Sequence, residues 1–218
     1  MALVQFTAPT VEPVTTAEAK DHLRVDITAD DALIVNLVKA ARVWSERYTR
    51  RSFVETEWDL VLDLFPPAAN RYYAFDEYNR FDLGRDFRAP SSLAQDTLLM
   101  PRPPLRSVTS INYVNTNGVT TLLAAAEYQV VTKWEPGRVV PAFTKVWPET
   151  RDQPEAVTIR YKAGFGTSAA DVPQPIRQAI LFLVGDLYEN REWQSDLVLE
   201  QNRTAKALLD IYRILEIH

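Results

Sequence analysis

The sequence predicts an α+β protein, in which N- and C-terminal helices form a bundle and an antiparallel β subdomain is inserted between them. Three observations lead to this class. Apolar residues recur at helical spacing up to about residue 54, alternate with polar residues between 55 and 165, and return to helical spacing from 166. A block of strands between two helical regions is typical of α+β folds and differs from alternating βαβ units.

The composition limits the size of the core and the kinds of function that the protein could have. The chain has 218 residues, of which 46% are hydrophobic, and this suits one sizeable domain or a domain with an inserted subdomain. The net charge of −5 argues against a general nucleic-acid binder, which usually carries a basic excess. The chain has no cysteine, so disulfides, thiolate metal sites and thiol catalysis are excluded. No signal peptide or membrane span is visible, and we expect a soluble protein made in the cytosol.

The first region, residues 1–54, is expected to supply the N-terminal helices. Thr15-Thr16-Ala17-Glu18 fits a capping box, and a short helix should follow it through Leu23. A second start signal at Asp30-Asp31 precedes a longer helix to about residue 50. Its apolar stripe includes three residues that we assign to the core: Leu37, Ala41 and Trp44.

The β subdomain should span residues 55–165. Apolar and acidic residues alternate from Glu57 to Leu64, which predicts a half-buried strand. Ser107–Val114 is the next predicted strand, and Asn117-Gly118 after it is a strong hairpin signal. Further short strands are predicted at 119–123, 128–132, 138–141 and 156–162.

Residues 67–96 follow neither period. Aromatic residues and arginines alternate there, a composition enriched at protein interfaces, and so long a loop is usually functional or mobile. We therefore predict that this segment is functional and contacts another protein. The candidate interface residues are Tyr72, Tyr73, Phe75, Tyr78, Arg80, Phe81, Arg85, Phe87 and Arg88.

The region 166–192 should contain the central helix of the bundle, from about 173 to 190. Prolines 173 and 175 fall where a helix accepts them, because first-turn N–H groups have no partner within the helix. Asp171 could cap these N–H groups. The helix is apolar nearly all round and should be buried nearly all round. Its predicted core residues are Ile176, Ile180, Leu183 and Leu187.

The last region, 193–218, is predicted to be a linker followed by a helix over about 204–217. One face of this helix carries Leu208, Ile211, Tyr212 and Leu215. Such a stripe either packs onto the chain's own bundle or docks into a groove of a partner protein. Both interpretations remain open, because a terminal helix is ordered only where something holds it.

Three features of the sequence resemble catalytic or ligand sites. Gly164–Ala169 fits the spacing G-x-G-x-x-A, but no helix opens within it and no acidic residue ends a following strand, so we interpret it as a turn. Asp30 and Asp31 fit a helix start, and Asp59 and Asp63 fit the polar face of a strand, although a cation site there is conceivable.

The chain has two histidines, and neither lies in a known catalytic or metal-binding motif. His22 and His218 do not share a metal-binding spacing, and no G-x-S-x-G motif supplies a nucleophile. We expect no cofactor, no metal site and no enzymatic activity.

Several stretches, taken in order, resemble phage head–tail connector (adaptor) proteins of long-tailed phages and gene-transfer particles. They are Thr16–Val25, Asp31–Thr49, Pro101–Ile111, Glu135–Val139, Trp147–Pro154 and Asp171–Glu192. The resemblance covers most of 14–65 and 97–192. It implies a virion structural protein at the neck, or head–tail junction, assembled in the host cytoplasm. Such connectors form a ring, here expected to be twelve-fold, that extends the DNA channel.

The same resemblance implies the partners. These are the portal protein, a tail-side stopper or tail-terminator protein, and further copies of the chain in the ring. DNA would pass through without sequence-specific binding, and no membrane is involved. Residues 67–96 depart from the family pattern as an insertion, which we expect to contact a neighbouring subunit, the capsid or the next tail component. Family behaviour implies that the C-terminal helix docks on the portal. A tail-completion protein, or a monomeric β-domain module that binds a peptide or sugar, is the alternative.

Overall fold

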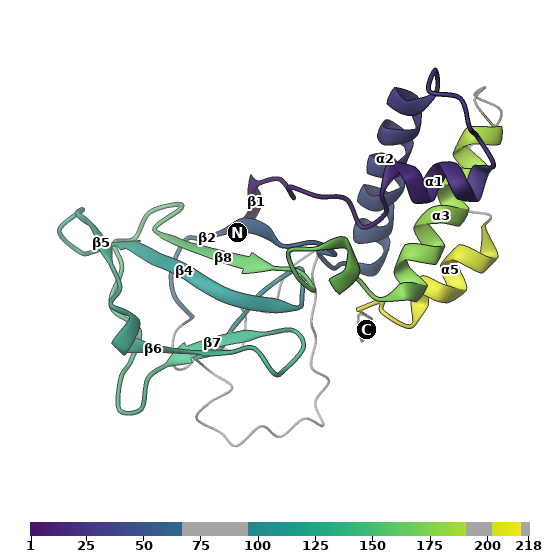
Figure 1. Ribbon diagram of the computed structural model, residues 1–218. Coiled ribbons are helices and arrows are strands. Elements are labelled where there is room, and N and C mark those ends of the chain that lie inside the picture. The colour runs from purple at the N-terminus through teal and green to yellow at the C-terminus, as the bar shows by residue number, and fades with distance from the viewer. Residues whose placement is uncertain (67–95, 191–201, 215–218) are drawn as a thin grey trace. The chain divides into compact units, whose positions relative to one another are not determined.

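The computed structural model describes residues 1–66, 96–190 and 202–214, and the predicted α+β class is confirmed (Figure 1). The chain divides into two compact units, each with its own core. In the described residues, the β unit comprises 1–8, 56–66 and 96–164, and the helical unit comprises 9–55, 165–190 and 202–214. The chain therefore begins in the β unit, crosses to the helical unit, returns, and crosses again.

The helical unit is built from four α-helices and one short 3₁₀ helix in its described residues. They are α1 (Thr16–Leu23), α2 (Asp31–Thr49), η2 (Ala169–Asp171), α3 (Gln174–Glu189) and α5 (Arg203–Asp210). The predicted capping box starts α1, because the Thr15 hydroxyl accepts from the Glu18 N–H and the Glu18 carboxylate accepts from the Thr15 N–H. Both α1 and α2 end on arginines with left-handed backbone, Arg24 and Arg50, which close the last turns.

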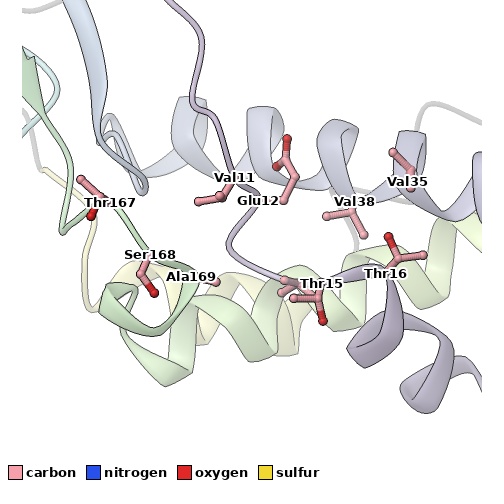
Figure 2. A pocket seen from close by; sticks show the side chains of 10 residues that line it. Val11, Glu12, Thr15, Thr16, Val35, Val38, Thr167, Ser168 and Ala169 are labelled. Carbon is pink, nitrogen blue, oxygen red and sulfur yellow. The ribbon is translucent and has the colours of Figure 1, made fainter.

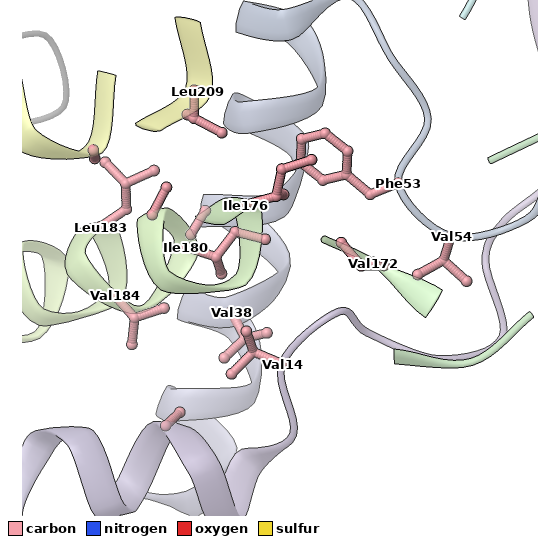
Figure 3. Packing of buried hydrophobic residues seen from close by; sticks show 14 of the residues in the cluster. Val14, Val38, Phe53, Val54, Val172, Ile176, Ile180, Leu183, Val184 and Leu209 are labelled. Atoms are coloured by element: carbon pink, nitrogen blue, oxygen red, sulfur yellow. The ribbon is translucent and has the colours of Figure 1, made fainter. Parts of the chain in front are cut away.

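Helix α3 lies at the centre of the helical core (Figure 3). Its inward residues Ile176, Ala179, Ile180, Leu183 and Val184 are fully buried. They share this core with residues from α1, α2, α5 and the segments beside the helices. These residues are Val14, Ala19, Ile34, Val38, Ala41, Phe53, Val54, Val172, Ala205 and Leu209.

The residues assigned to the core from the sequence occupy two layers. Ala41, Ile176, Ile180 and Leu183 have no exposed surface. Leu37, Trp44 and Leu187 are partly buried and pack against that cluster. Helix α3 has no exposed residue between positions 175 and 188, and the residues on its other faces are partly buried.

The start of α3 differs from the prediction in one detail. Asp171 does not cap this helix, which begins after Pro173 without a side-chain cap. The Asp171 carboxylate instead accepts from the Ser168 N–H at 2.9 Å and closes a capping box around η2. Pro175 in the first turn of α3 has no N–H to satisfy, which lessens the need for a cap.

The β unit contains two antiparallel sheets. The five-stranded sheet has the order β1-β2-β8-β4-β5, with β1 (Ala2–Thr7), β2 (Thr56–Leu62), β8 (Val157–Ala163), β4 (Leu105–Val114) and β5 (Thr120–Leu122). The three-stranded sheet has the order β3-β7-β6, with β3 (Leu98–Leu99), β7 (Arg138–Pro141) and β6 (Tyr128–Val131). A 3₁₀ helix, η1 (Ala125–Glu127), precedes β6.

Strand β8 is the centre of the larger sheet and has a strict inside–outside alternation. Its inward residues Val157, Ile159 and Tyr161 have no exposed surface, and Ile159 lies opposite Leu60 of β2 and Ile111 of β4. The Tyr161 hydroxyl donates to the Pro101 carbonyl at 3.0 Å. Burial raises the pKa of this phenol, so it stays a neutral donor.

Strand β1 was not predicted from the sequence, which placed residues 1–54 with the helices. It pairs with β2 along the edge of the larger sheet, with Leu3 opposite Leu60. Leu3 packs against the core, whereas Val4 and Phe6 point outward and are each 52% exposed. Residues 4–7 do alternate, but their apolar members Val4 and Phe6 lie on the exposed face, so the alternation does not mark the buried side of this strand.

Candidate functional site

The glycine turn at 164–169 is held by the chain's own backbone. Phe165 donates to the Phe53 carbonyl at 3.0 Å, and Glu55 donates to the Gly166 carbonyl at 2.7 Å. The helical turn that follows is only three residues long, and the Asp171 carboxylate already accepts from the Ser168 N–H there. A phosphate group needs free N–H donors at a helix start, so this turn does not suit one.

The aspartates considered as cation ligands all have partners in the protein. Asp59 forms a bidentate pair with Arg160, with both N–O distances 2.8 Å. Asp63 accepts from the Glu155 N–H at 3.0 Å. Among the described residues, no group of three or more histidine, aspartate or glutamate side chains could hold a metal ion.

Asp30 and Asp31 likewise serve the helical unit. Asp31 pairs with Lys20 at 2.6 Å and so joins α2 to α1. Asp30 accepts a hydrogen bond from the Tyr188 hydroxyl, which joins α2 to α3. His22 lies edge-on against Phe182 with 5.9 Å between the ring centroids, and His218 falls outside the described residues. No helix in the described parts of the chain is long and apolar enough to cross a membrane.

An open pocket of about 540 Å³ lies within the helical unit (Figure 2). Three segments that are distant in sequence line it: residues 11–16, residues 35–38 and residues 167–169. Its apolar wall is formed by valines and an alanine, and its polar wall by hydroxyls and one carboxylate. The lining residues are Val11, Glu12, Val14, Thr15, Thr16, Val35, Val38, Thr167, Ser168 and Ala169.

A charged network holds one wall of this pocket in place. The Arg42 guanidinium donates to Glu12 at 2.7 Å and to Glu46 at 2.8 Å. Glu46 also accepts from the Phe53 N–H at 2.9 Å. Burial works to lower the pKa of Arg42, but the two carboxylates outweigh it and raise that pKa. Two carboxylates therefore share one fully charged guanidinium.

A second pair, Glu18 with Arg177, joins α1 to α3 beside the pocket. The pKa of Glu18 lies below its ordinary value, chiefly because its carboxylate accepts from the Thr15 N–H at 2.8 Å. Burial opposes this effect, while the Thr15 hydroxyl and Arg177 add to it. A lowered pKa in the folded state stabilises the fold above the unfolded-state value of about 4.3, and this stabilisation is lost as the pH falls through the folded-state pKa.

Glu18→Gln is therefore expected to lower the free energy of unfolding by about 1 kcal/mol at neutral pH, because it weakens the cap and the pair with Arg177. The difference from wild type should shrink as the pH falls through the lowered folded-state pKa, because the wild-type carboxylate then becomes protonated as well. Urea unfolding at neutral pH and at the lowest pH at which the protein stays folded measures this. Asp21→Asn, at an exposed position of the same helix, is the matched control and should change little. An effect of Glu18→Gln that is equal at both pH values would contradict this account.

The candidates for portal docking do not form one exposed stripe. Helix α5 ends at Asp210, and not near 217 as predicted, so Ile211 and Tyr212 follow the helix. Leu208 and Tyr212 are partly buried against the chain's own core, and Ala205 and Leu209 are fully buried there. Ile211 points outward and is 73% exposed. Leu215 lies outside the described residues.

The candidate interface in 67–96 cannot be placed, because Tyr72, Tyr73, Phe75, Tyr78, Arg80, Phe81, Arg85, Phe87 and Arg88 all lie outside the described residues. Sequence reasoning missed two surface features of the described part. One is the pocket, and the other is a loop of the β unit that exposes Phe143 and Val146. An aromatic residue between a strand and Trp147-Pro148 was the only signal for the loop.

Comparisons with known proteins agree with this architecture. Residues 14–82 match the family model of the phage gp6-like head–tail connector proteins. No protein with curated annotation matches the chain. A chain in the neck of an empty gene transfer agent (GTA) particle, computed with C6 symmetry, is 23% identical with a TM-score of 0.74, and the match covers 100% of this chain and 98% of that one.

Two further structures match over the same shares of both chains. A chain in the virion of a native gene transfer agent particle is 22% identical with a TM-score of 0.74. A chain in the neck of a native GTA particle, computed with C12 symmetry, is 22% identical with a TM-score of 0.73. The resemblance predicted from the sequence is therefore confirmed: residues 14–82 match the head–tail connector family, and the whole chain has the fold of chains found in gene transfer agent particles.

Proposed function

We propose that the chain is a structural protein of the neck of a phage or gene-transfer particle, located between the portal and the tail. The observation that carries this proposal is the agreement of two independent comparisons. The connector family model matches residues 14–82, and chains from particle necks share the fold over the full length. The engaged carboxylates and the occupied glycine turn support a structural role without catalysis.

The proposed assembly is a ring of twelve copies, the symmetry with which one of the similar necks was computed. Copies in such a ring meet through two different surfaces, one on each side, because a head-to-tail contact repeated around an axis closes on itself. The ring would extend the DNA channel towards the tail. A net charge of −5 suits a wall along which DNA slides, since phosphates are repelled by an acidic surface.

Portal docking is assigned to the end of the chain from Ile211 onward. Leu208 and Tyr212 are engaged in the chain's own bundle, so they contribute by holding α5 in place. Ile211 is free to enter an apolar groove, because it is 73% exposed. The opposite side of the ring would bind a tail-side stopper or tail-terminator protein.

Inactivation of the gene tests this function. The particle-producing host should then accumulate DNA-filled heads and free tails that do not join, and the wild-type gene supplied in trans should restore complete particles. Electron microscopy of the lysate distinguishes the outcomes. Normal complete particles without the protein would refute a neck role, and tails of altered length on joined heads would favour a tail-completion protein.

The segment 67–96 is proposed to contact a neighbouring subunit or a tail-side protein through its aromatic and arginine side chains. Deletion of residues 68–95 should leave a folded protein, because the strands and helices that the structure describes form a core in each unit from residues outside this segment. In the complementation assay this variant should fail to join heads to tails. Circular dichroism is the control for folding, and full complementation by the deletion variant would sink the idea.

A further inference from the structure

The two edge strands of the larger sheet carry none of the charges that normally keep a sheet edge from pairing with another chain. β1 and β5 lie at opposite ends of the order β1-β2-β8-β4-β5 (Figure 1). Proteins usually protect such edges with charged side chains. Here the charged residues all lie on the three strands between the edges: Glu57, Asp59, Arg106, Arg160 and Lys162.

Both edges also expose large apolar side chains. Val4 and Phe6 of β1 are each 52% exposed, and Leu122 of β5 is 63% exposed. The edge strands of the smaller sheet, β3 and β6, have no exposed large hydrophobic residue. An uncharged edge that exposes apolar side chains is suited to pairing with a further strand.

Val4 and Leu122 lie on the same face of the sheet, although they belong to opposite edges. The register leads from Val4 through one partner on β2 to Arg160 of β8. It leads from Leu122 through one partner on β4 to Thr158 of β8. Arg160 and Thr158 are two residues apart on one strand, so all of these side chains share the outer face.

The backbone of both edge strands has hydrogen-bonding groups directed away from the sheet. The Leu123 N–H donates to the Ile111 carbonyl of β4 at 2.8 Å. Because successive residues of a strand direct these groups to opposite sides, Thr120 and Leu122 direct theirs away from β4. In the described parts of the chain, β5 pairs only with β4 and β1 pairs only with β2.

The two edge strands run in the same direction. Each strand of the sheet is antiparallel to the next, so the first and the fifth are parallel to each other. A copy related by rotation can therefore place its β1 beside β5, and the sheet continues with its outer face on the same side. Pairing of β1 with β1 would leave β5 unpaired, whereas pairing of β1 with β5 satisfies both edges of every copy.

We propose that β1 of one copy pairs in parallel with β5 of a neighbouring copy, so that the sheet continues from subunit to subunit. Val4 and Leu122 then cover each other on the outer face, since neighbouring strands lie about 4.8 Å apart. The register of β1 shifts after Gln5, which confines regular pairing to residues 2–5 and matches the three residues of β5.

The contact is head-to-tail, because the two edges are different surfaces, and its repetition around an axis closes a ring. This inference rests on the proposed ring and identifies the strands that would join its subunits.

Cross-linking in assembled particles tests the contact, because the chain has no cysteine of its own. A chain with Val4→Cys and Leu122→Cys replaces the wild type in the complementation assay, and purified particles are treated with a short bismaleimide. A denaturing gel should show a ladder of dimers and larger multiples, with positions 4 and 122 joined in the linked peptides found by mass spectrometry. Within one copy the two positions are four strand spacings apart, about 19 Å along the sheet.

Two control chains show whether the ladder reports this pairing. Val4→Cys alone should give no dimer, and a dimer from it would indicate pairing of β1 with β1 and overturn the proposal. Val43→Cys, in place of Leu122→Cys, puts the second thiol at a position of α2 that is 54% exposed. This pair should give no ladder, and a ladder equal to that of the edge pair would overturn the proposal as well.

Thr120→Pro tests the backbone pairing itself. It removes an N–H that faces away from β4, and edge strands tolerate proline at such positions, so the melting temperature should stay close to that of the wild type. In the complementation assay this variant should fail to join heads to tails. Normal joining by the Thr120→Pro chain would overturn the pairing, and if that variant is unstable the cross-links decide alone.

The outcomes also separate this inference from the proposed function. Joined particles that contain the double-cysteine chain but give no ladder reject the strand pairing alone. Normal complete particles after inactivation of the gene reject the neck role and the strand pairing together.

Discussion

Ending the chain after Arg203 is expected to lower the free energy of unfolding of the helical unit by more than about 3 kcal/mol. That is the typical loss when a single buried leucine is replaced by alanine. The truncation removes two fully buried side chains, Ala205 and Leu209, and uncovers one face of α3. It also removes the bond from the Tyr48 hydroxyl to Asp210, which is 2.7 Å long. Urea unfolding followed by circular dichroism measures the loss.

Ile211→Asp is the matched variant for this truncation. It changes a residue that is 73% exposed, so the free energy of unfolding should stay within about 0.5 kcal/mol of wild type. If the end of the chain docks on the portal, this substitution should weaken binding to purified portal without unfolding the bundle. A truncated chain as stable as wild type would show that α5 is not part of the core, contrary to the packing described above.

Gly166→Ala is the second change with a large expected effect, a loss of about 1–3 kcal/mol in the free energy of unfolding. A Cβ atom at this position would lie 2.1 Å from the Asp171 carboxylate oxygen and 2.4 Å from the Asp171 Cβ. Asp171 cannot withdraw freely, because its carboxylate accepts from the Ser168 N–H and closes η2. The added methyl group must therefore displace either the cap or the turn.

Gly185→Ala provides the control within the same unit. Its added Cβ would meet only His22 Nε2, at 3.8 Å, which is ordinary contact, and Gly185 lies inside α3. Alanine is favoured over glycine in a helix interior by about 1 kcal/mol, so this variant should equal or exceed the wild type in stability. Thermal melts of both variants decide the matter, and equal losses at the two positions would contradict the crowding argument.

The long elements could be predicted because each carries several independent signals. Helix α2 combines a start signal at Asp30-Asp31 with an apolar stripe through Ile34, Val38 and Ala41, and all three of these are buried. Strand β8 alternates strictly, and its inward residues meet apolar partners on both sides. Local propensity and tertiary packing agree in these elements, so the sequence alone predicts them.

Elements shaped mainly by tertiary contacts were missed or misplaced. Strand β1 has only a short alternation whose apolar residues Val4 and Phe6 lie on its exposed face, and its pairing with β2 is what holds it in the sheet. Helix α5 ends at Asp210 although its apolar spacing continues. Beyond it, the chain is tied back to α2, where the Ile214 N–H donates to the Thr49 carbonyl at 3.1 Å. No local sequence pattern predicts a hydrogen bond between two segments so far apart in the chain.

The candidate surfaces were harder to predict than the fold. The pocket is formed by three segments that lie far apart in the sequence, at residues 11–16, 35–38 and 167–169. No short sequence motif extends over such a distance, so the pocket could not be predicted from residue spacing. The loop is recognisable only from the exposure of Phe143, because an isolated aromatic residue in a sequence is more often buried than presented. Sequence reasoning interpreted the glycine turn as structural and left a cation site at Asp59 and Asp63 conceivable. In the structure Asp59 pairs with Arg160, and the Asp171 carboxylate accepts from the Ser168 N–H.

The most direct test of the central claim is a cryo-electron microscopy reconstruction of purified particles from the producing host, with the neck resolved well enough to trace side chains. We predict a ring of this chain between portal and tail, with twelve copies, as in the C12 symmetry of a similar neck. Density for Trp44, Trp58 and Trp147 would identify the chain in that ring. A neck built entirely of other proteins, with this chain absent from the particle or placed in the capsid or tail tube, would contradict the account.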